Sequence, residues 1–258
     1  MKVQLLPSSF GLGGAVSQRQ HLSCLVIDDS VAFDAGSLAF SCSDLHRELI
    51  RDIFLSHAHL DHIAGLPIYL DDLFSVLTEP VRVHATAEMI DVLERDVFNW
   101  SVYPKFSKLR NSSGPVIEYR PFMPGTVVPI KHLNFMPVEV NHNVPSVGVL
   151  VSDNKCSIGI TGDTAHTDEI WKLFSSRKDL AAVLIECAFP DELAELAGVS
   201  HHLTPSELVS ELFKFGRTDV PVYVINIKPM YRERVNEQIK QLNIAHLEVL
   251  EIGRDYEF

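Results

Sequence analysis

The hydrophobic positions of this chain fall into short apolar runs that alternate with amphipathic stretches. Short runs rich in Val, Ile, Leu and Phe are typical of buried strands, whereas apolar residues spaced three and four apart predict helices. The predicted strands span residues 22–27, 31–34, 53–56, 81–84, 147–151, 157–161, 181–186 and 222–225. The predicted helices span residues 62–77, 86–98 and 205–215. This alternation predicts an α/β chain.

Two segments, one in each half of the chain, share a pattern of strand, acidic turn, strand and terminal Asp. The first ends its second strand at Asp34, and the second ends near Asp163. The Asp-Asp and Asp-Asn pairs at the turns suit a tight hairpin. One hairpin in each half predicts two similar sheets packed face to face with helices outside. Two unrelated occurrences of a common motif are the alternative.

Two other segments lack this periodicity. Residues 111–129 are rich in proline and glycine, which predicts a surface loop. The glycine cluster at residues 11–14 precedes a predicted strand rather than a helix, so the mechanism of a phosphate-binding loop is missing there. We therefore interpret it as a turn.

Length and charge limit the class of protein. A chain of 258 residues with 46% apolar residues can bury one large core, which predicts a single domain over residues 1–258. Lys and Arg number 22 against 34 Asp and Glu, for a net charge of −12, and no basic cluster is present to bind a row of phosphates. We therefore expect no long nucleic acid as a partner. A small anion would need local positive groups such as metal ions.

The cysteines and the lengths of the apolar runs indicate the cellular compartment of the protein. No pair of cysteines has C-x-x-C spacing, which predicts buried free thiols in a reducing compartment. The chain has neither the apolar start of a secretory signal nor a run of about 20 apolar residues that would span a membrane. We predict a cytoplasmic protein with no membrane partner. The cysteines are Cys24, Cys42, Cys156 and Cys187.

The strongest chemical signal is the run H-A-H-L-D-H from His57 to His62. A predicted strand ends at Ser56 and a predicted helix begins near His62, so the loop between them carries three imidazoles and one carboxylate. Imidazole and carboxylate together suit a borderline divalent ion such as zinc. A single His at a strand end would be structural, but this spacing predicts a metal site.

This run resembles, at every position, the H-x-H-x-D-H signature of the metallo-β-lactamase superfamily. The resemblance implies the metallo-β-lactamase αββα sandwich, an α/β fold in which two packed mixed sheets are flanked by helices. It also implies two divalent metal ions, with His57 and His59 on the first ion and Asp61 and His62 on the second. Zinc is the expected metal, and manganese and iron are the alternatives.

Further positions match the family's pattern in order. His142 follows a strand where the family has its third ligand to the first metal, and Asp163 resembles the carboxylate that bridges both metals. A strand-end Asp alone would be a cap or turn residue. Asp34 resembles the family's Asp that orients a ligand without binding metal. Asn226 stands where the family has a His; because an amide oxygen is a weaker zinc ligand, we expect the second metal to bind loosely or to be a harder ion such as manganese.

Other segments resemble class II cyclic-nucleotide phosphodiesterases. Residues 99–106 are similar to that family's Asn-x-x-x-aromatic-Pro-x-Phe segment, and Ile227-Lys228-Pro229 resembles the tail of its Thr-His-Ile-Lys-Pro motif. An aromatic side chain in the first segment would stack on a purine, although core packing explains an aromatic at a helix end equally well. The resemblance implies substrate contacts from Asn99, Trp100, Tyr103, His201 and Lys228.

The run His201-His202-Leu-Thr-Pro resembles the His-Leu-Thr-Pro motif of the same phosphodiesterases. Thr204 and Glu207 are spaced as a capping box that would begin a helix and fix the preceding loop. His202 directly precedes Leu-Thr-Pro, so we expect it to protonate the departing ribose oxygen. Asp61 and His202 are the predicted catalytic residues.

These features predict a metal-dependent phosphodiesterase that hydrolyses 3′,5′-cyclic nucleotides, cyclic AMP or cyclic GMP, to 5′-nucleotides with a metal-activated water. A ribonuclease Z-like transfer-RNA 3′-processing nuclease is an alternative, which the acidic composition and the lack of a basic arm disfavour. A nucleotide-binding member with weakened catalysis is another, because Asn226 replaces the expected His. Thioester or β-lactam hydrolysis is the third. The expected partner is a small cyclic nucleotide, and a homodimer is expected on base rates.

Overall fold

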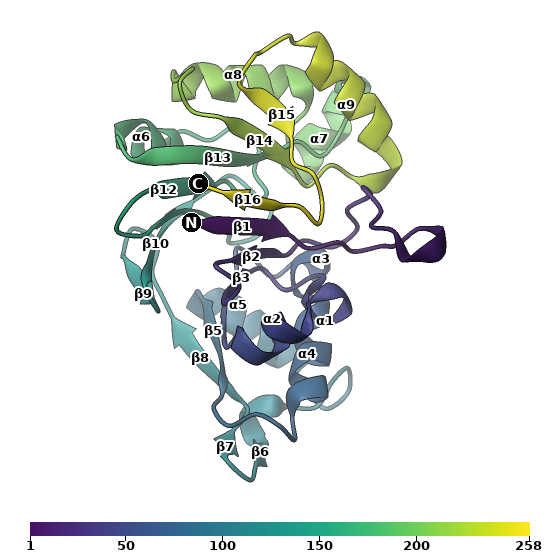
Figure 1. Cartoon of the computed structure of the whole chain (residues 1–258), viewed down its shortest axis with the longest axis vertical. Helices are drawn as coiled ribbons and strands as arrows, with labels where there is room; N and C mark the ends of the chain where they lie inside the picture. The colour runs from purple at the N-terminus through teal and green to yellow at the C-terminus, as the bar shows by residue number, and fades with distance from the viewer. The chain divides into compact units, whose positions relative to one another are not determined.

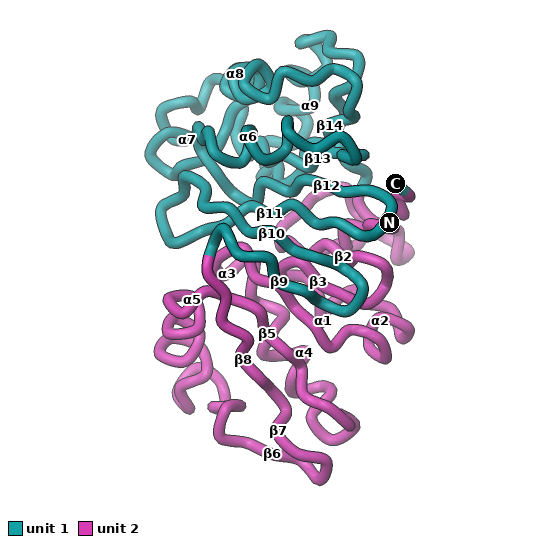
Figure 2. Tube along the Cα trace, turned by 90° about the vertical axis from the view of Figure 1, so that its left-hand side faces the viewer, with its two compact units in different colours: residues 1, 124–251, 258 teal, residues 2–123, 252–257 magenta.

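The structure is a computed structural model of residues 1–258. The contacts between its residues divide it into two compact units (Figure 2). Unit 1 comprises Met1, residues 124–251 and Phe258, and unit 2 comprises residues 2–123 and 252–257. Each unit contains one seven-stranded mixed sheet. The two predicted mixed sheets are therefore confirmed, while the assignment of all residues to a single domain stays a prediction.

The sheet of unit 2 has the strand order β16-β1-β2-β3-β4-β5-β8. The pairings from β16 to β3 are antiparallel and those from β3 to β8 are parallel. Asp28 and Asp29, with left-handed φ of 45° and 54°, form the turn between β2 and β3, a conformation that Asp tolerates better than most residues. The strands are β1 (Lys2–Leu5), β2 (Leu25–Ile27), β3 (Val31–Phe33), β4 (Asp52–Phe54), β5 (Val81–Ala85), β8 (Ile117–Pro121) and β16 (Asp255–Glu257).

Helices and short elements complete unit 2. Helix α4 packs against α1, and α5 packs against β8 (Figure 1). The helices are α1 (Leu38–Ser41), α2 (Asp44–Leu49), α3 (Leu60–Ile63), α4 (Gly65–Leu73), α5 (Ala87–Val92) and the π-helical turn η2 (Leu93–Val97). The short elements are the turns η1 (Leu12–Gly14) and η3 (Phe106–Lys108) and the strand pair β6 (Arg110–Asn111) and β7 (Gly114–Pro115).

The sheet of unit 1 repeats the same succession of pairings. Its order is β15-β14-β13-β12-β11-β10-β9, antiparallel from β9 to β12 and parallel from β12 to β15. Both predicted hairpins, β2–β3 and β11–β12, are present, and the prediction of two similar sheets is confirmed. The strands are β9 (Val128–Ile130), β10 (Leu133–Glu139), β11 (Val147–Ser152), β12 (Ser157–Ile160), β13 (Leu180–Glu186), β14 (Val222–Ile225) and β15 (Leu247–Val249).

The helices of unit 1 cover one face of its sheet (Figure 2). Alternate residues of β13 and β14 pack there against Trp171 and Phe174 of α6, Leu208 and Phe215 of α8, and residues of α9. This cluster is the core that holds the unit together. The helices are α6 (Glu169–Ser176), α7 (Ala194–Ser200), α8 (Pro205–Phe215) and α9 (Arg232–Gln241), with the turns η4 (Asp191–Leu193) and η5 (Pro229–Tyr231).

Helix boundaries follow local chemistry. Helix α8 has the predicted bounds because Thr204 and Glu207 form a reciprocal capping box, Pro205 is its first residue, and Gly216 ends it with a left-handed φ of 67°. The predicted helix over residues 62–77 is instead two helices, α3 and α4. The break comes where the Gly65 amide donates to the Ala35 carbonyl, 3.0 Å away.

The predicted loop over residues 111–129 was wrong, because it contains β7, β8 and the start of β9. Val116 and Ile117 are buried there, and β8 lies at the edge of its sheet, where a proline costs no ladder hydrogen bond. The prediction of a turn over residues 11–14 agrees with η1.

All four cysteines are free thiols, as predicted, but only two of them are buried. Cys24 and Cys187 lie in the core, and burial raises the pKa of both thiols well above the ordinary value. Cys42 and Cys156 are half-buried. None of the helices combines the length and the apolar character needed to cross a bilayer.

Candidate metal centre

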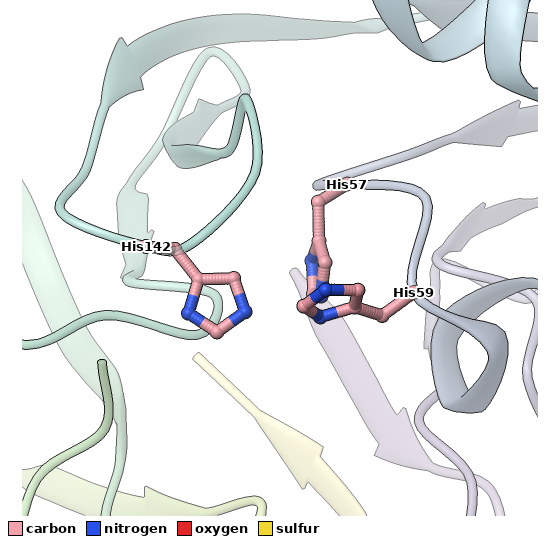
Figure 3. Close-up of side chains that lie close together, drawn as sticks. All are labelled: His57, His59 and His142. Carbon is pink, nitrogen blue, oxygen red and sulfur yellow. The ribbon is translucent and has the colours of Figure 1, made fainter. Parts of the chain in front are cut away.

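The first group of candidate ligands, which we term the unit 2 cluster, consists of His57, His59, Asp61 and His62. It lies on the loop after β4, where His59 is the N-cap of α3 and Asp61 is in the first turn of that helix. The ring centroid of His57 lies 4.7 Å from that of His59 and 4.1 Å from that of His62. Figure 3 shows His57 and His59 projecting from this loop. The structure therefore brings the three imidazoles of the run together.

A buried carboxylate lies behind this cluster. Asp34 accepts hydrogen bonds from the Ser56 amide at 2.8 Å and the Ser56 hydroxyl at 2.9 Å, and it contacts His62 Nδ1 at 2.7 Å. Ser56 Oγ also lies 2.9 Å from His57 Nδ1. Burial raises the pKa of Asp34, and the His62 and Ser56 contacts act in the opposite direction. His57 and His62 thus engage Nδ1 with the protein, which leaves Nε2 as the ring nitrogen that can coordinate a metal.

The backbone of the unit 2 cluster is held by the residues before β2 and after β3. The Ser23 amide donates to the Asp61 carbonyl at 2.8 Å, and the Ala35 amide donates to the His62 carbonyl at 2.7 Å. A Cβ at Gly36 would lie 1.9 Å from the Asp61 carbonyl oxygen, so only glycine fits at this position. These contacts hold Asp61 and His62 in place through their main chain.

The second group, which we term the unit 1 cluster, consists of His142, Asp163 and His202. One ligand atom of each lies within 4.8 Å of the others, a spacing that fits a shared ion. His142 is on the loop between β10 and β11 (Figure 3), Asp163 follows β12, and His202 lies between α7 and α8. His142 Nδ1 donates to the His201 carbonyl at 3.0 Å, so this imidazole also presents Nε2.

Glu186, at the end of β13, supports the unit 1 cluster and could not be identified from the sequence. Its carboxylate is fully buried, lies 2.8 Å from His202 Nδ1, and also accepts hydrogen bonds from the Thr164, Ala188 and Leu203 amides at 3.0, 3.1 and 3.2 Å. Burial alone would lower the pKa of His202, but the Glu186 carboxylate, with a smaller contribution from Asp163, raises it. The available signal was a Glu that ends an otherwise apolar strand.

Asn226 follows β14 and is half-buried, with a left-handed φ of 55°. Its Nδ2 donates to Asp163 Oδ1 at 2.5 Å. The residue at the position of the family's last His therefore contacts the carboxylate predicted to bridge the metals. The backbone amide of Lys228, two residues later, donates to the carbonyl of Ala188 at 3.1 Å, and Ala188 is the second residue after Glu186.

The structure places Asn99, Trp100 and Tyr103 in one tight turn of unit 2. The Asn99 side chain accepts from the Ser101 and Val102 amides, both at 2.9 Å, and the Tyr103 hydroxyl donates to Asp71 at 3.3 Å. Trp100 is 61% exposed and has a left-handed φ of 70°. Asn99 and Tyr103 therefore build the turn that presents the Trp100 indole. The roles of these residues in substrate binding stay predictions.

The donors present fit a divalent transition metal. Imidazole nitrogens and carboxylate oxygens are the ligands that zinc and its neighbours prefer. His57, His62, His142 and His202 each engage Nδ1 with a hydroxyl, a carbonyl or a carboxylate, which is the supporting contact found behind metal-binding histidines. Both clusters are consistent with metal binding.

Comparison with known proteins agrees with this assignment. A model of the β-lactamase superfamily domain matches residues 27–220, a range that holds both clusters. The chain belongs to the metallo-β-lactamase superfamily. Membership and the His and Asp clusters together make a metal-dependent hydrolase the general class.

Individual proteins of known sequence or structure are also similar to the chain. The chain is 27% identical over 233 residues to a probable 3′,5′-cyclic-nucleotide phosphodiesterase of Yersinia pestis, an alignment that covers 79% of this chain and 64% of that protein. The chain thus spans less than two thirds of the length of that relative. Unliganded yeast PDE1 matches with a TM-score of 0.75 and 17% identity over 97% of both chains. The short form of human tRNase Z matches with a TM-score of 0.68 and 18% identity over 100% of this chain and 99% of that one. These two structural likenesses show the fold.

Proposed function

We propose that this chain is a metal-dependent phosphodiesterase that hydrolyses 3′,5′-cyclic nucleotides to 5′-nucleotides. The observation that carries the proposal is the buried Glu186–His202 pair beside Asp163, which provides a supported proton donor next to candidate metal ligands. The similarity to a probable cyclic-nucleotide phosphodiesterase supports this substrate class.

Each cluster would supply its own residues as ligands. His57, His59, Asp61 and His62 would bind through the unit 2 cluster, and His142 and Asp163 through the unit 1 cluster. Two divalent ions, when bound, supply an activated water nucleophile and neutralise the charge of the phosphate. Zinc is the metal that we propose, with manganese or iron as substitutes. Asn226 would hold the Asp163 carboxylate through its amide rather than act as a strong ligand.

His202 would supply the proton that the leaving oxygen needs. When the bond between phosphorus and the ribose 3′ oxygen breaks, that oxygen takes the proton from Nε2 of the His202 imidazolium. Glu186 accepts from Nδ1 at 2.8 Å, which fixes the plane of the ring and stabilises its charged form. Because Glu186 also accepts hydrogen bonds from three backbone amides, its carboxylate is held in one position.

The base would be held by an exposed aromatic group. Trp100 is presented by a turn that Asn99 and Tyr103 stabilise, and an indole can stack on a purine. The net charge of −12 disfavours a long polyanion, so a small cyclic nucleotide fits better than transfer RNA.

The test is the release of 5′-AMP or 5′-GMP from cyclic AMP or cyclic GMP by the purified chain with zinc or manganese, beside an Asn226→His variant. Turnover by both proteins supports the proposal and makes Asn226 a tolerated residue. Turnover by Asn226→His alone makes the unaltered chain a nucleotide-binding form with weakened catalysis. Cleavage of precursor transfer RNA without turnover of cyclic nucleotides would overturn the proposal in favour of the ribonuclease Z-like alternative.

A further inference from the structure

Three loops of unit 1 each carry one residue of the unit 1 cluster. Asn141, on the His142 loop, forms hydrogen bonds with the other two loops. Asn141 precedes His142 in the sequence. Its backbone amide donates to Thr164 Oγ1 at 3.1 Å, and its carbonyl accepts from the Ala165 amide at 2.8 Å. Thr164 directly follows Asp163. The main chain of Asn141 therefore joins the His142 loop to the Asp163 loop.

The side chain of Asn141 adds two further hydrogen bonds. Its Nδ2 donates to the His166 carbonyl at 3.0 Å, and its Oδ1 accepts from His201 Nδ1 at 2.9 Å. A primary amide is the group that can donate to a carbonyl on one side and accept from an imidazole on the other. The amide of Asn141 thus joins the Asp163 loop to the residue that precedes His202.

His201 completes the circuit. It ends helix α7 in a left-handed conformation with φ of 54°, and its carbonyl accepts from His142 Nδ1 at 3.0 Å. Asn141 holds the ring of His201, and the carbonyl of His201 orients the ring of His142. The residues that these hydrogen bonds join either belong to the cluster or lie within three residues of one of its members in the sequence.

We propose that Asn141 is a positioning residue that holds His142 and Asp163 in the arrangement needed to bind metal, with His202 beside them. The assignment rests on the proposed function, in which these residues form a metal-dependent site. Asn141 itself is exposed, so its hydrogen bonds add little to the stability of the fold. Its effect is therefore expected in metal affinity rather than in folding, because residues behind metal ligands affect binding through ligand orientation.

Asn143 provides a matched control. It is also an exposed Asn on the other side of His142, and its single side-chain contact is with the Val199 carbonyl at 3.5 Å. Asn143→Ala removes the same atoms from the same loop without touching the circuit. His201→Gly is the second variant, because glycine keeps the left-handed conformation and the carbonyl while it removes the ring.

The experiment measures Zn²⁺ affinity by competition with a coloured chelator, together with the visible absorption spectrum of the Co²⁺-loaded protein. We expect Asn141→Ala to weaken Zn²⁺ binding by about 10- to 100-fold and to change the Co²⁺ spectrum. Asn143→Ala should bind Zn²⁺ like the unaltered chain. The metal-free forms of the two variants should melt within about 2 °C of one another. Adding His201→Gly to Asn141→Ala should cause little further loss, because Asn141→Ala already removes the hydrogen bond between these two side chains.

Equal Zn²⁺ affinities of Asn141→Ala and Asn143→Ala would overturn the assignment while leaving the proposed function intact. Additive losses in the double variant would contradict the circuit through His201. Failure of the unaltered chain to bind Zn²⁺ or Co²⁺ would refute the proposed function and this role together. Normal metal binding without turnover of any cyclic nucleotide would refute only the proposed substrate, and the comparison of the two Asn variants would still decide the role of Asn141.

Discussion

Replacing Gly36 with alanine should displace the backbone that carries Asp61 and His62. The added Cβ would lie 1.9 Å from the Asp61 carbonyl oxygen and 2.8 Å from both the amide nitrogen and the carbonyl oxygen of Ser23. All three are main-chain atoms, so no rotation of a side chain relieves the clash. The Gly36 amide donates to the Ser23 carbonyl and the Ser23 amide donates to the Asp61 carbonyl, each at 2.8 Å, so both hydrogen bonds depend on this close approach.

The size of the effect follows from these distances. Ordinary contacts of a Cβ begin at 3.4 Å, so the Asp61 carbonyl must move by about 1.5 Å, the difference between 3.4 and 1.9 Å. Overpacking of this kind costs about 1–3 kcal/mol, and each lost backbone hydrogen bond costs about 0.5–1.5 kcal/mol. We expect Gly36→Ala to lower the free energy of unfolding by about 2–6 kcal/mol. A shift of that size would also misplace Asp61 as a ligand.

The assay combines chemical denaturation of the metal-free protein with measurement of Zn²⁺ affinity. Gly198→Ala is the control, because a Cβ there meets no atom within 4 Å and lies in helix α7, where alanine is favoured over glycine. Gly36→Ala should be less stable than Gly198→Ala and should bind Zn²⁺ more weakly. Equal stability and equal Zn²⁺ affinity of the two variants would refute the reasoning.

Three further changes test other parts of the molecule. His202→Ala should lower the turnover of cyclic AMP far more than the zinc content, and equal losses of both would contradict its role as a proton donor. Glu186→Gln should lower kcat by about 10²- to 10⁴-fold, because a neutral amide stabilises the imidazolium poorly; an unchanged kcat in steady-state assays would exclude this role. Burial raises the pKa of Asp52, but its hydrogen bonds with Arg82 and His84 outweigh that effect and hold the pKa well below its ordinary value. The stabilisation that ionised Asp52 contributes is complete above about pH 4 and is lost as the pH falls below that value. The free energy of unfolding should therefore drop more steeply between about pH 5 and pH 2 in the unaltered chain than in Asp52→Asn. Equal slopes in the two proteins would contradict this.

Contiguous features were accessible from the sequence. The hairpins β2–β3 and β11–β12 carry their own turn residues, and α8 carries its own cap, so local chemistry was sufficient to predict them. The three imidazoles at His57, His59 and His62 lie within six residues, so their convergence needed only a strand end and a loop. The strand β8 was missed because Pro115 precedes it and Pro121 is its last residue, and a proline is tolerated there because β8 lies at the edge of the sheet.

Features that depend on tertiary contacts were not accessible. Glu186 reads as the last residue of an apolar strand, and nothing near it in sequence indicates that its carboxylate meets His202 and three backbone amides. Asn141 is a loop residue whose partners lie in the Asp163 loop and at the end of α7. The π-helical turn η2 interrupts a sequence with ordinary helical spacing.

The pairing scheme of the two sheets explains why the candidate residues gather where they do. In both units an antiparallel hairpin is followed by parallel strands, and the carboxyl ends of parallel neighbours lie at the same edge of a sheet. In unit 2, Phe33 pairs with Phe54, so Asp34 and the unit 2 cluster leave the sheet side by side. In unit 1, Glu186 pairs with Ile225, so Glu186 and Asn226 lie at the same edge of the sheet. Strand β12 runs parallel to β13 and ends at this edge shortly before Asp163. Asp34 and Asp163 follow the second strand of equivalent hairpins, yet Asp34 is enclosed by Ser56 and His62 whereas Asp163 contacts Asn226 within the unit 1 cluster. The same local pattern thus yields an orienting carboxylate in one unit and a candidate metal ligand in the other, because the residues that surround it differ.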